Sequence, residues 1–364
     1  MIRSHTTRRF ALSALCVLAF GAALAFPSAL PGGGSAPDPD HLWAEDTVFA
    51  VRQVRPGVYF AVGRQGRLVG ANSVFVVTDR DVILVDDHIT PRAARALVAE
   101  IRSVTDKPLR YVVNTHFHYD HVSGNTIFGP EVEIVSHPAT RQRLLGGGAQ
   151  MVRDQLAAAE RQVAALRARR DTTRGDSARA ALDLALAEWT VYAEEYRTLR
   201  LVLPTLTADS GLVFHRGGGQ ELRVFWLGRG HTAGDVVVQM PREGLLLSGD
   251  LITNTQGPPF AADGYAGEWA ATLRRLGALV GDSTETLPGH GEPFRGGARY
   301  RATADLFDDV WAQARAIAAR ALPPDSATRG FDMSRHLATF PALRNGLSRA
   351  AAVRAVDLAA GRAN

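Results

Sequence analysis

Cysteine is almost absent from this 364-residue chain, which has a single one at position 16. Cys16 lies inside an apolar N-terminal run that we expect to be removed on export. The mature chain could then form no internal disulfide and could use no thiol as a nucleophile or metal ligand. Thiol chemistry is therefore excluded.

Lysine is equally scarce, because Lys107 is the only one and arginine carries nearly all of the positive charge. The formal net charge is +4, but three arginines lie in the first 26 residues, where there are no acidic residues. Without them, 41 − 3 = 38 basic residues face 37 acidic ones. The basic balance therefore gives no reason to expect a nucleic-acid partner. With 46% apolar residues, the chain is long enough for a globular enzyme.

Residues 1–26 have the three parts of a secretory signal peptide: a basic start, an apolar run and the small-residue cleavage site Ala23-Leu24-Ala25. Arg8-Arg9 also fits a twin-arginine signal. An uncleaved anchor is the alternative, but an apolar run of about 17 residues is at the lower limit for spanning a bilayer. We expect a periplasmic or secreted protein with no stable membrane insertion once the leader is removed. Residues 27–44, rich in proline and glycine, are expected to be a linker.

Residues 45–300 are expected to form the catalytic domain. Thr90-Pro91 is typical of a helix start, and Asp106-Lys107-Pro108 of its end. Polar motifs follow directly after several apolar strands, so they occupy loops at strand ends, where active sites are commonly built. The strands are predicted at residues 58–62, 73–77, 82–85, 109–113, 222–227, 236–240, 245–247 and 285–287, with a helix around 268–280.

Residues 149–200 differ in composition, with apolar residues at helical spacing on either side of a turn at residues 172–176. This pattern predicts an inserted helical hairpin whose arms, each about 30 Å long, protrude from the domain. A lid over the active site and a homodimerisation arm are both compatible with it. Residues 301–364 are predicted to be a helical C-terminal extension, interrupted at Pro323-Pro324.

Five of the eleven histidines and two aspartates occur in four short motifs. One such histidine alone is usually a hydrogen-bonded core residue, but the H-x-H-x-D-H run at residues 116–121 is a specific metal-binding pattern. Zinc accepts both imidazole nitrogen and carboxylate oxygen. The predicted metal ligands are His116, His118, Asp120, His121, His231, Asp250 and His290.

These ligands divide into two positions. His116 and His118 can converge on one metal, which His231 completes. Asp120 and His121 continue the turn and can face a second metal, which His290 completes. Asp250 has one oxygen available for each metal and would bridge them. His88 follows a strand end, and its relation to the site stays open.

The motifs resemble the metallo-β-lactamase superfamily over about residues 50–300. The resemblance implies an α+β fold, an αββα sandwich with two zinc ions at one edge. It makes Asp86 a partner that orients a ligand. The sequence departs from the family pattern after Asp86, where Asp87-His88 stands in place of Thr-Gly or Ser-Gly. The matching segments are Leu84-Val85-Asp86, residues 114–121, residues 230–235, residues 247–250 and residues 288–291.

Two metals about 3.5–4 Å apart can hold a bridging water and lower its pKa towards about 7. We expect the resulting hydroxide to attack a small-molecule lactam, lactone or ester, with Asp120 as the catalytic residue that orients it and accepts its proton. Asp250 resembles the glyoxalase II-like ligand set, because the commonest β-lactamases have cysteine at this position and another group has serine.

Three alternatives remain. The chain could be a β-lactamase proper, since fold does not fix the substrate. It could be an iron-dependent redox enzyme of the same fold, resembling persulfide dioxygenases, and iron or manganese are alternatives to zinc. A flavodiiron protein fits poorly, because that family has glutamate where His118 stands. A binding module without catalysis fits poorly too, because all seven ligands are retained.

Overall fold

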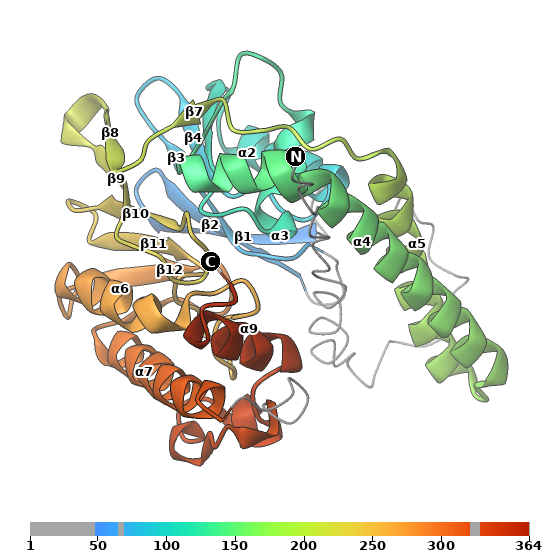
Figure 1. The fold of residues 1–364 in the computed structure, drawn as a ribbon. Coiled ribbons are helices and arrows are strands. Elements are labelled where there is room, and N and C mark those ends of the chain that lie inside the picture. The colour runs from blue at the N-terminus through green and yellow to red at the C-terminus, as the bar shows by residue number, and fades with distance from the viewer. Residues whose placement is uncertain (1–47, 65–68, 321–327, 364) are drawn as a thin grey trace, which may run out of the picture.

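A computed structural model describes residues 48–64, 69–320 and 328–363 (Figure 1). The expected leader, the linker, Cys16 and the Pro323-Pro324 interruption lie outside the described residues. Within the described residues, no helix is both long enough and apolar enough to cross a bilayer.

Two mixed β-sheets form the centre of the molecule (Figure 1). The first sheet runs in sequence order and contains β1 (Phe49–Arg55), β2 (Val58–Gly63), β3 (Ser73–Val77), β4 (Val82–Val85), β5 (Leu109–Val113), β6 (Glu133–Ser136) and β7 (Leu206–Thr207). The second sheet has the order β13-β12-β11-β10-β9-β8 and contains β8 (Gly211–His215), β9 (Glu221–Trp226), β10 (Val236–Met240), β11 (Leu245–Gly249), β12 (Glu285–Pro288) and β13 (Phe294–Arg295).

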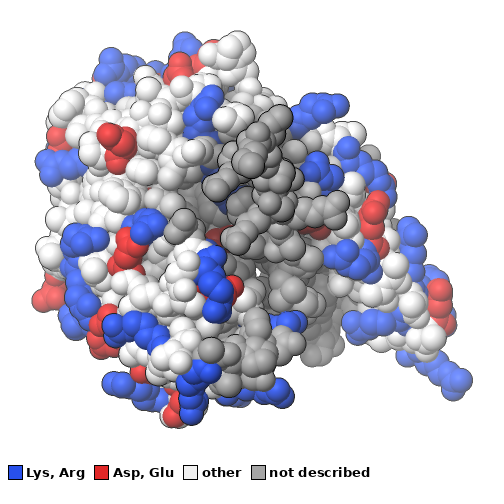
Figure 2. Space-filling model, viewed as in Figure 1, with Lys and Arg blue, Asp and Glu red and all other residues white. Residues whose placement is uncertain are grey.

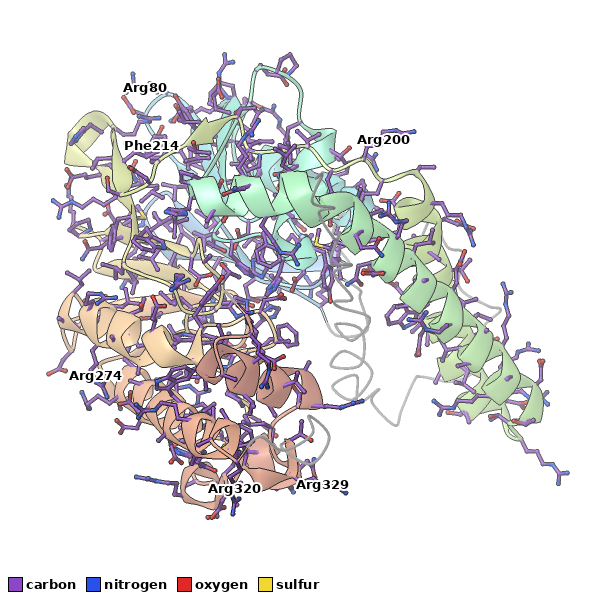
Figure 3. All side chains as sticks on the ribbon, in the orientation of Figure 1. Arg80, Arg200, Phe214, Arg274, Arg320 and Arg329 are labelled. Atoms are coloured by element: carbon purple, nitrogen blue, oxygen red, sulfur yellow. The ribbon has the colours of Figure 1, made fainter. Side chains whose placement is uncertain are left out.

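The main apolar core lies between the two sheets. Alternate residues of each strand point to opposite faces, so one set of side chains from each sheet faces this core. Ile83 and Val85 of β4 face this core, whereas Leu84 faces a helix on the outside. Across the core, Tyr111 of β5 meets Phe214 of β8 with ring centroids 4.8 Å apart. Figure 3 labels Phe214. The predicted α+β sandwich is confirmed.

Among the described residues, one helix packs on the first sheet and three pack on the second. On the first sheet lies α2 (Pro91–Val104), whose N-cap Thr90 accepts a hydrogen bond from the Ala93 amide at 3.1 Å, as Thr90-Pro91 predicts. On the second sheet lie α6 (Ala266–Ala278), α7 (Ala298–Ala318) and α9 (Arg349–Ala359). Short 3-10 helices at Thr328–Gly330, Ser334–His336 and Pro341–Asn345 complete this layer.

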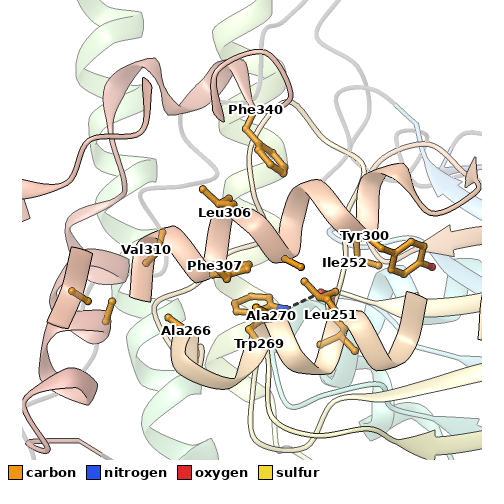
Figure 4. Close-up of a cluster of buried hydrophobic side chains, with 14 of the residues drawn as sticks. Leu251, Ile252, Ala266, Trp269, Ala270, Tyr300, Leu306, Phe307, Val310 and Phe340 are labelled. Atoms are coloured by element: carbon orange, nitrogen blue, oxygen red, sulfur yellow. Dashed lines mark hydrogen bonds between the residues drawn. The ribbon is translucent and has the colours of Figure 1, made fainter. Parts of the chain in front are cut away.

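The helices after residue 300 share a core with the second sheet rather than forming a separate appendage. Trp269 of α6 stacks on Phe307 of α7 with ring centroids 3.9 Å apart (Figure 4). The expected domain boundary at residue 300 therefore falls inside α7, which belongs to the sandwich. Arg274, Arg320 and Arg329 are exposed on the outside of this layer (Figure 3).

The helical hairpin consists of α4 (Pro138–Thr172) and α5 (Asp176–Thr198), and its far end projects well away from the sheets (Figure 1). Arginine and acidic side chains lie on its surface (Figure 2). The turn lies where the sequence predicts it, but α4 begins at Pro138 instead of residue 149. Three consecutive glycines, residues 146–148, lie inside α4 although each is unfavourable in a helix by about 1 kcal/mol relative to alanine. Gly148 is explained by packing, because a Cβ there would meet the Leu201 side chain at 2.9 Å.

Candidate metal centre

The predicted ligands meet at one edge of the sandwich, because their motifs follow the ends of neighbouring strands. The motif at residues 116–121 follows β5, which pairs in parallel with β4. Asp250 follows β11 and His290 follows β12, and these two strands also pair in parallel. Parallel strands end at the same edge, so three separate segments deliver their side chains to one place.

Within the motif, polar and apolar side chains separate onto two faces. The histidines and Asp120 face the other ligands, whereas Phe117 and Val122 pack on Leu144 of α4. Tyr119, in the short helix α3 (Tyr119–Val122), packs into the base of the hairpin. A 3-10 helix at Ser123–Ile127 follows. The base of the hairpin thus packs against the apolar face of the loop at residues 116–121.

Three imidazole nitrogens form a tight triangle. His116 Nε2 lies 3.0 Å from His118 Nδ1 and 3.2 Å from His231 Nε2, and the third edge is 2.8 Å. Zinc–nitrogen bonds of about 2.0–2.1 Å at tetrahedral angles place ligand nitrogens roughly 3.3 Å apart. The triangle therefore fits one face of a tetrahedral metal site. We call these three residues the first group.

A second group comprises Asp120, His121 and His290. Asp120 Oδ2 lies 3.2 Å from His290 Nε2 and 3.7 Å from His121 Nε2. Asp250 lies between the two groups, because its Oδ2 is 3.2 Å from His290 Nε2 and 3.7 Å from His231 Nε2. One oxygen of Asp250 faces ligands of both groups, whereas its Oδ1 faces His121 at 3.6 Å.

Among the described residues, two buried polar atoms at this centre have no hydrogen-bond partner: His121 Nε2 and Asp250 Oδ1. A buried nitrogen or oxygen without a partner is costly, by about 1–3 kcal/mol. The two atoms lie 3.6 Å apart, and a cation bound between them would satisfy both. Together with the nitrogen triangle, these atoms form a donor set that fits metal binding.

The outward-facing ring nitrogens of the ligands are held by acceptors. Asp86 Oδ2 lies 2.7 Å from His121 Nδ1 and accepts from Thr115 Oγ1 at 2.8 Å. Thr115 Oγ1 in turn lies 3.0 Å from His116 Nδ1. We assign the protons to these Nδ1 atoms, which leaves the inner nitrogens of His116 and His121 free to bind a metal. Asp86 thus occupies the orienting position that the resemblance implies.

Two further supports come from the loop between β11 and α6. His118 Nε2 lies 3.1 Å from Asp263 Oδ2, and His231 Nδ1 lies 2.8 Å from the backbone oxygen of Phe260. Sequence reasoning missed both, and also gave Thr115 no role. Asp263 lies between motifs, with no strand or helix pattern around it, and a backbone oxygen leaves no signal in a sequence.

The two groups differ in charge. Burial and neighbouring histidines hold the pKa of His116 well below its usual range and that of His231 at about 3, so both rings are neutral at pH 7. In the second group burial lowers the pKa of His290, but Asp250 and Asp120 outweigh it and raise the pKa to about 10. Burial likewise raises the pKa of Asp120, but His121 and His290 outweigh it and hold the pKa at about 2.

The turn after β4 departs from ordinary backbone geometry. Asp86 has φ 61° and His88 has φ 73°, a region that side-chain-bearing residues rarely adopt. His88 is buried, with Nδ1 2.7 Å from the Val69 oxygen and Nε2 3.0 Å from Ser73 Oγ. The structure therefore places His88 in a supporting network beside the centre and outside both ligand groups.

The comparisons with known proteins agree with this geometry. The family model described as the metallo-beta-lactamase superfamily matches residues 66–291. The metallo-beta-lactamase IND-1 of Chryseobacterium indologenes is 32% identical over 96 residues, which are 26% of this chain and 40% of that protein. A type 2 metallo-beta-lactamase of Bacillus cereus is 23% identical over 62% of this chain and 69% of its own length.

A solved metallo-beta-lactamase from Pontibacter korlensis shares the fold, with a TM-score of 0.51 and 19% identity over 71% of this chain and 99% of that one. The family match covers more than half of the chain, and the described residues supply the family's sandwich and a converging set of histidines and aspartates. The chain therefore belongs to the metallo-β-lactamase superfamily, whose members are generally metal-dependent hydrolases.

Proposed function

We propose that this chain is an exported binuclear zinc hydrolase that cleaves a lactam, lactone or ester bond in a small molecule. The observation that carries the proposal is the position of Asp250, whose Oδ2 faces ligands of both groups at 3.7 and 3.2 Å. A bridging carboxylate between two sets of nitrogen donors is an arrangement for a metal pair.

When bound, two such metals lower the pKa of a water and polarise the substrate oxygen. The residues around them determine where the substrate can approach. The His290 side chain is 25% exposed and that of Asp263 is 18% exposed, whereas His121 and His231 are fully buried. We expect the substrate to reach the centre from the side of His290 and Asp263.

Asp120 is the proposed catalytic residue. Its carboxylate lies on the second group, with Oδ2 3.2 Å from His290 Nε2, and the low pKa keeps it ionised at neutral pH. An ionised carboxylate at this position can orient a water through a hydrogen bond and accept its proton. Its burial limits exchange of that proton with bulk solvent.

Two observations favour different classes of substrate. Asp250 favours the glyoxalase II-like hydrolases, because the commonest β-lactamases have cysteine there. The curated relatives in the comparisons carry the name metallo-beta-lactamase, which favours β-lactamase activity as the second candidate. The first of these matches spans 40% of the relative's length, so its activity is a proposal for this chain.

The experiment is hydrolysis of a chromogenic cephalosporin by residues 27–364 supplied with zinc, beside a chelated sample and an Asp120→Asn variant. Ring opening that both controls abolish supports lactam hydrolysis. Hydrolysis of a chromogenic ester or lactone instead, with the same two controls, supports the wider substrate class. No metal-dependent turnover of any of these probes, at full metal occupancy, overturns the proposed substrate class.

Export is tested separately. We propose that the chain is cleaved after Ala25 and accumulates outside the cytoplasm. Amino-terminal sequencing of the protein from the periplasmic or culture fraction should begin near residue 26, and full-length protein confined to the cytoplasm would contradict this.

A further inference from the structure

The loop at residues 251–265, between β11 and α6, supports the first group from outside. Its Phe260 oxygen and Asp263 carboxylate hold His231 and His118 at 2.8 and 3.1 Å. Among the described residues, no other hydrogen-bond partner holds the outward nitrogen of either ring. The orientation of two first-group ligands therefore depends on where this loop lies.

The loop is fixed by the C-terminal helical layer. At its start, the Leu251 oxygen accepts a hydrogen bond from Trp269 Nε1 at 2.9 Å, within the buried cluster of Figure 4. Further along, Arg299 of α7 donates to the carbonyls of three alternate loop residues: Thr253 at 3.0 Å, Thr255 at 2.9 Å and Gly257 at 3.3 Å.

Arg299 is itself held in place. Its Nη1 donates to the Thr339 oxygen at 3.3 Å, and its guanidinium lies 4.4 Å from the centre of the buried Phe340 ring. A planar guanidinium can serve several carbonyls at once, which a lysine ammonium cannot reproduce in the same geometry. One side chain thus connects the helices after residue 298 to the loop that supports the metal centre.

The second group has supports outside this loop but also contacts it. The Asn254 side chain of the loop donates to the Glu292 oxygen at 2.9 Å, and Asn254 forms a β-bridge with Gly291. His121 is oriented by Asp86, which follows β4 in the first sheet. The loop touches the His290 segment through the Asn254 amide, which donates to the His290 oxygen at 3.0 Å. That segment is also held by Asn72, whose amide donates to the Gly289 oxygen at 2.7 Å and whose side chain donates to the Pro288 and Gly291 oxygens.

We propose that Arg299 is a positioning residue that sets metal affinity at the first group through the 251–265 loop, with a smaller effect on the second group. The outward nitrogens of His118 and His231 are thereby supported by the loop and, through it, by the helices after residue 298. Asp86 supports His121 directly and His116 through Thr115. This inference concerns metal binding and stands apart from the substrate proposed above.

The test is a zinc titration of the folded protein in competition with a chromogenic chelator. His231→Ala and His290→Ala serve as standards, since each removes a ligand from one group and identifies the titration step that belongs to it. Arg299→Gln should weaken the first-group step about tenfold and move the second-group step less. Asp263→Asn should weaken the first-group step by about 10–100-fold, the usual effect of losing a partner of a ligand, and leave the second step unchanged.

Arg301→Gln is the matched control, because Arg301 is an exposed arginine on the same helix. It should leave both steps unchanged. Unchanged steps in Arg299→Gln, or equal weakening of both, would overturn the proposal. If Arg299→Gln fails to fold, the role of the loop is tested with Asp263→Asn and with a Phe260→Pro variant that displaces the loop carbonyl. Equal effects of these variants on both titration steps would overturn the proposal. Two bound zinc ions without turnover of any probe would refute the proposed substrate and leave this inference intact.

Discussion

Asp86 Oδ2 lies 2.7 Å from His121 Nδ1, and the same oxygen accepts a hydrogen bond from Thr115 Oγ1. Its other oxygen accepts from the Thr115 amide at 2.8 Å. Through Thr115, which contacts His116, this one buried carboxylate fixes a ligand in each group. Asp86 belongs to neither group, yet it contacts His121 directly and His116 through Thr115, and so links the two groups.

Replacing Asp86 with asparagine should therefore weaken both metal positions. The amide nitrogen cannot accept a hydrogen bond from His121 or Thr115, so at least one of these contacts is lost. We expect a 10–100-fold loss of zinc affinity, measured by chelator competition. Asp79→Asn, in the exposed turn between β3 and β4, is the control and should not change the affinity.

Asp120→Asn should lower kcat by about 10²–10⁴, the range for loss of a general base. The variant keeps the size of the side chain but cannot accept a proton. Because Asp120 is also a member of the second group, the rate should be measured at saturating zinc with metal content determined in the same sample. A kcat equal to that of the parent at full occupancy would remove Asp120 from the reaction.

Metal should stabilise the folded chain. A ligand that binds only the native state at about 100 times its Kd adds about 2.7 kcal/mol. Thermal unfolding should therefore shift to higher temperature on addition of zinc and return on chelation. The His231→Ala and His290→Ala variants should each lose part of the shift. A shift of the same size in both variants and the parent would show that the stabilising zinc binds elsewhere.

Trp269→Phe should lower the free energy of unfolding by about 1–3 kcal/mol, because it leaves the buried Leu251 oxygen without its indole donor. Urea unfolding measures the change. Trp311→Phe, in the half-buried part of α7, is the matched control and should have a smaller effect. Equal losses in the two variants would show that ring packing, not the hydrogen bond, dominates.

The convergence of the candidate ligands could be predicted from the sequence because each of them follows a recognisable strand and because the H-x-H-x-D-H run is local. Parallel pairing of β4 with β5 and of β11 with β12 brings strand ends together within each sheet, and the packing of the two sheets then brings the two sets together. The supports of the ligands could be predicted only partly. Asp86 follows a strand and belongs to a family motif, whereas Asp263 reaches His118 across 145 positions in the chain, from a loop of no regular pattern.

Three features of the fold could not be predicted from the sequence: the start of α4, the two shortest strands and the packing of the helices after residue 300. The sequence predicts the hairpin to begin at residue 149, where the composition changes, whereas α4 begins at Pro138 and continues through the glycines at 146–148. The strands β7 and β13 have two residues each, too few for any alternation to be visible. The helices after residue 300 have an apolar face in the sequence, but nothing local tells which sheet it covers.

The most direct test of the account is the number of zinc ions bound per chain, measured by elemental analysis of the protein after dialysis, with iron and manganese determined in the same samples. A binuclear centre should hold two zinc ions in the parent and one in each of the His231→Ala and His290→Ala variants. A parent that holds a single metal ion, or one whose metal content is unchanged in both variants, would contradict the binuclear centre.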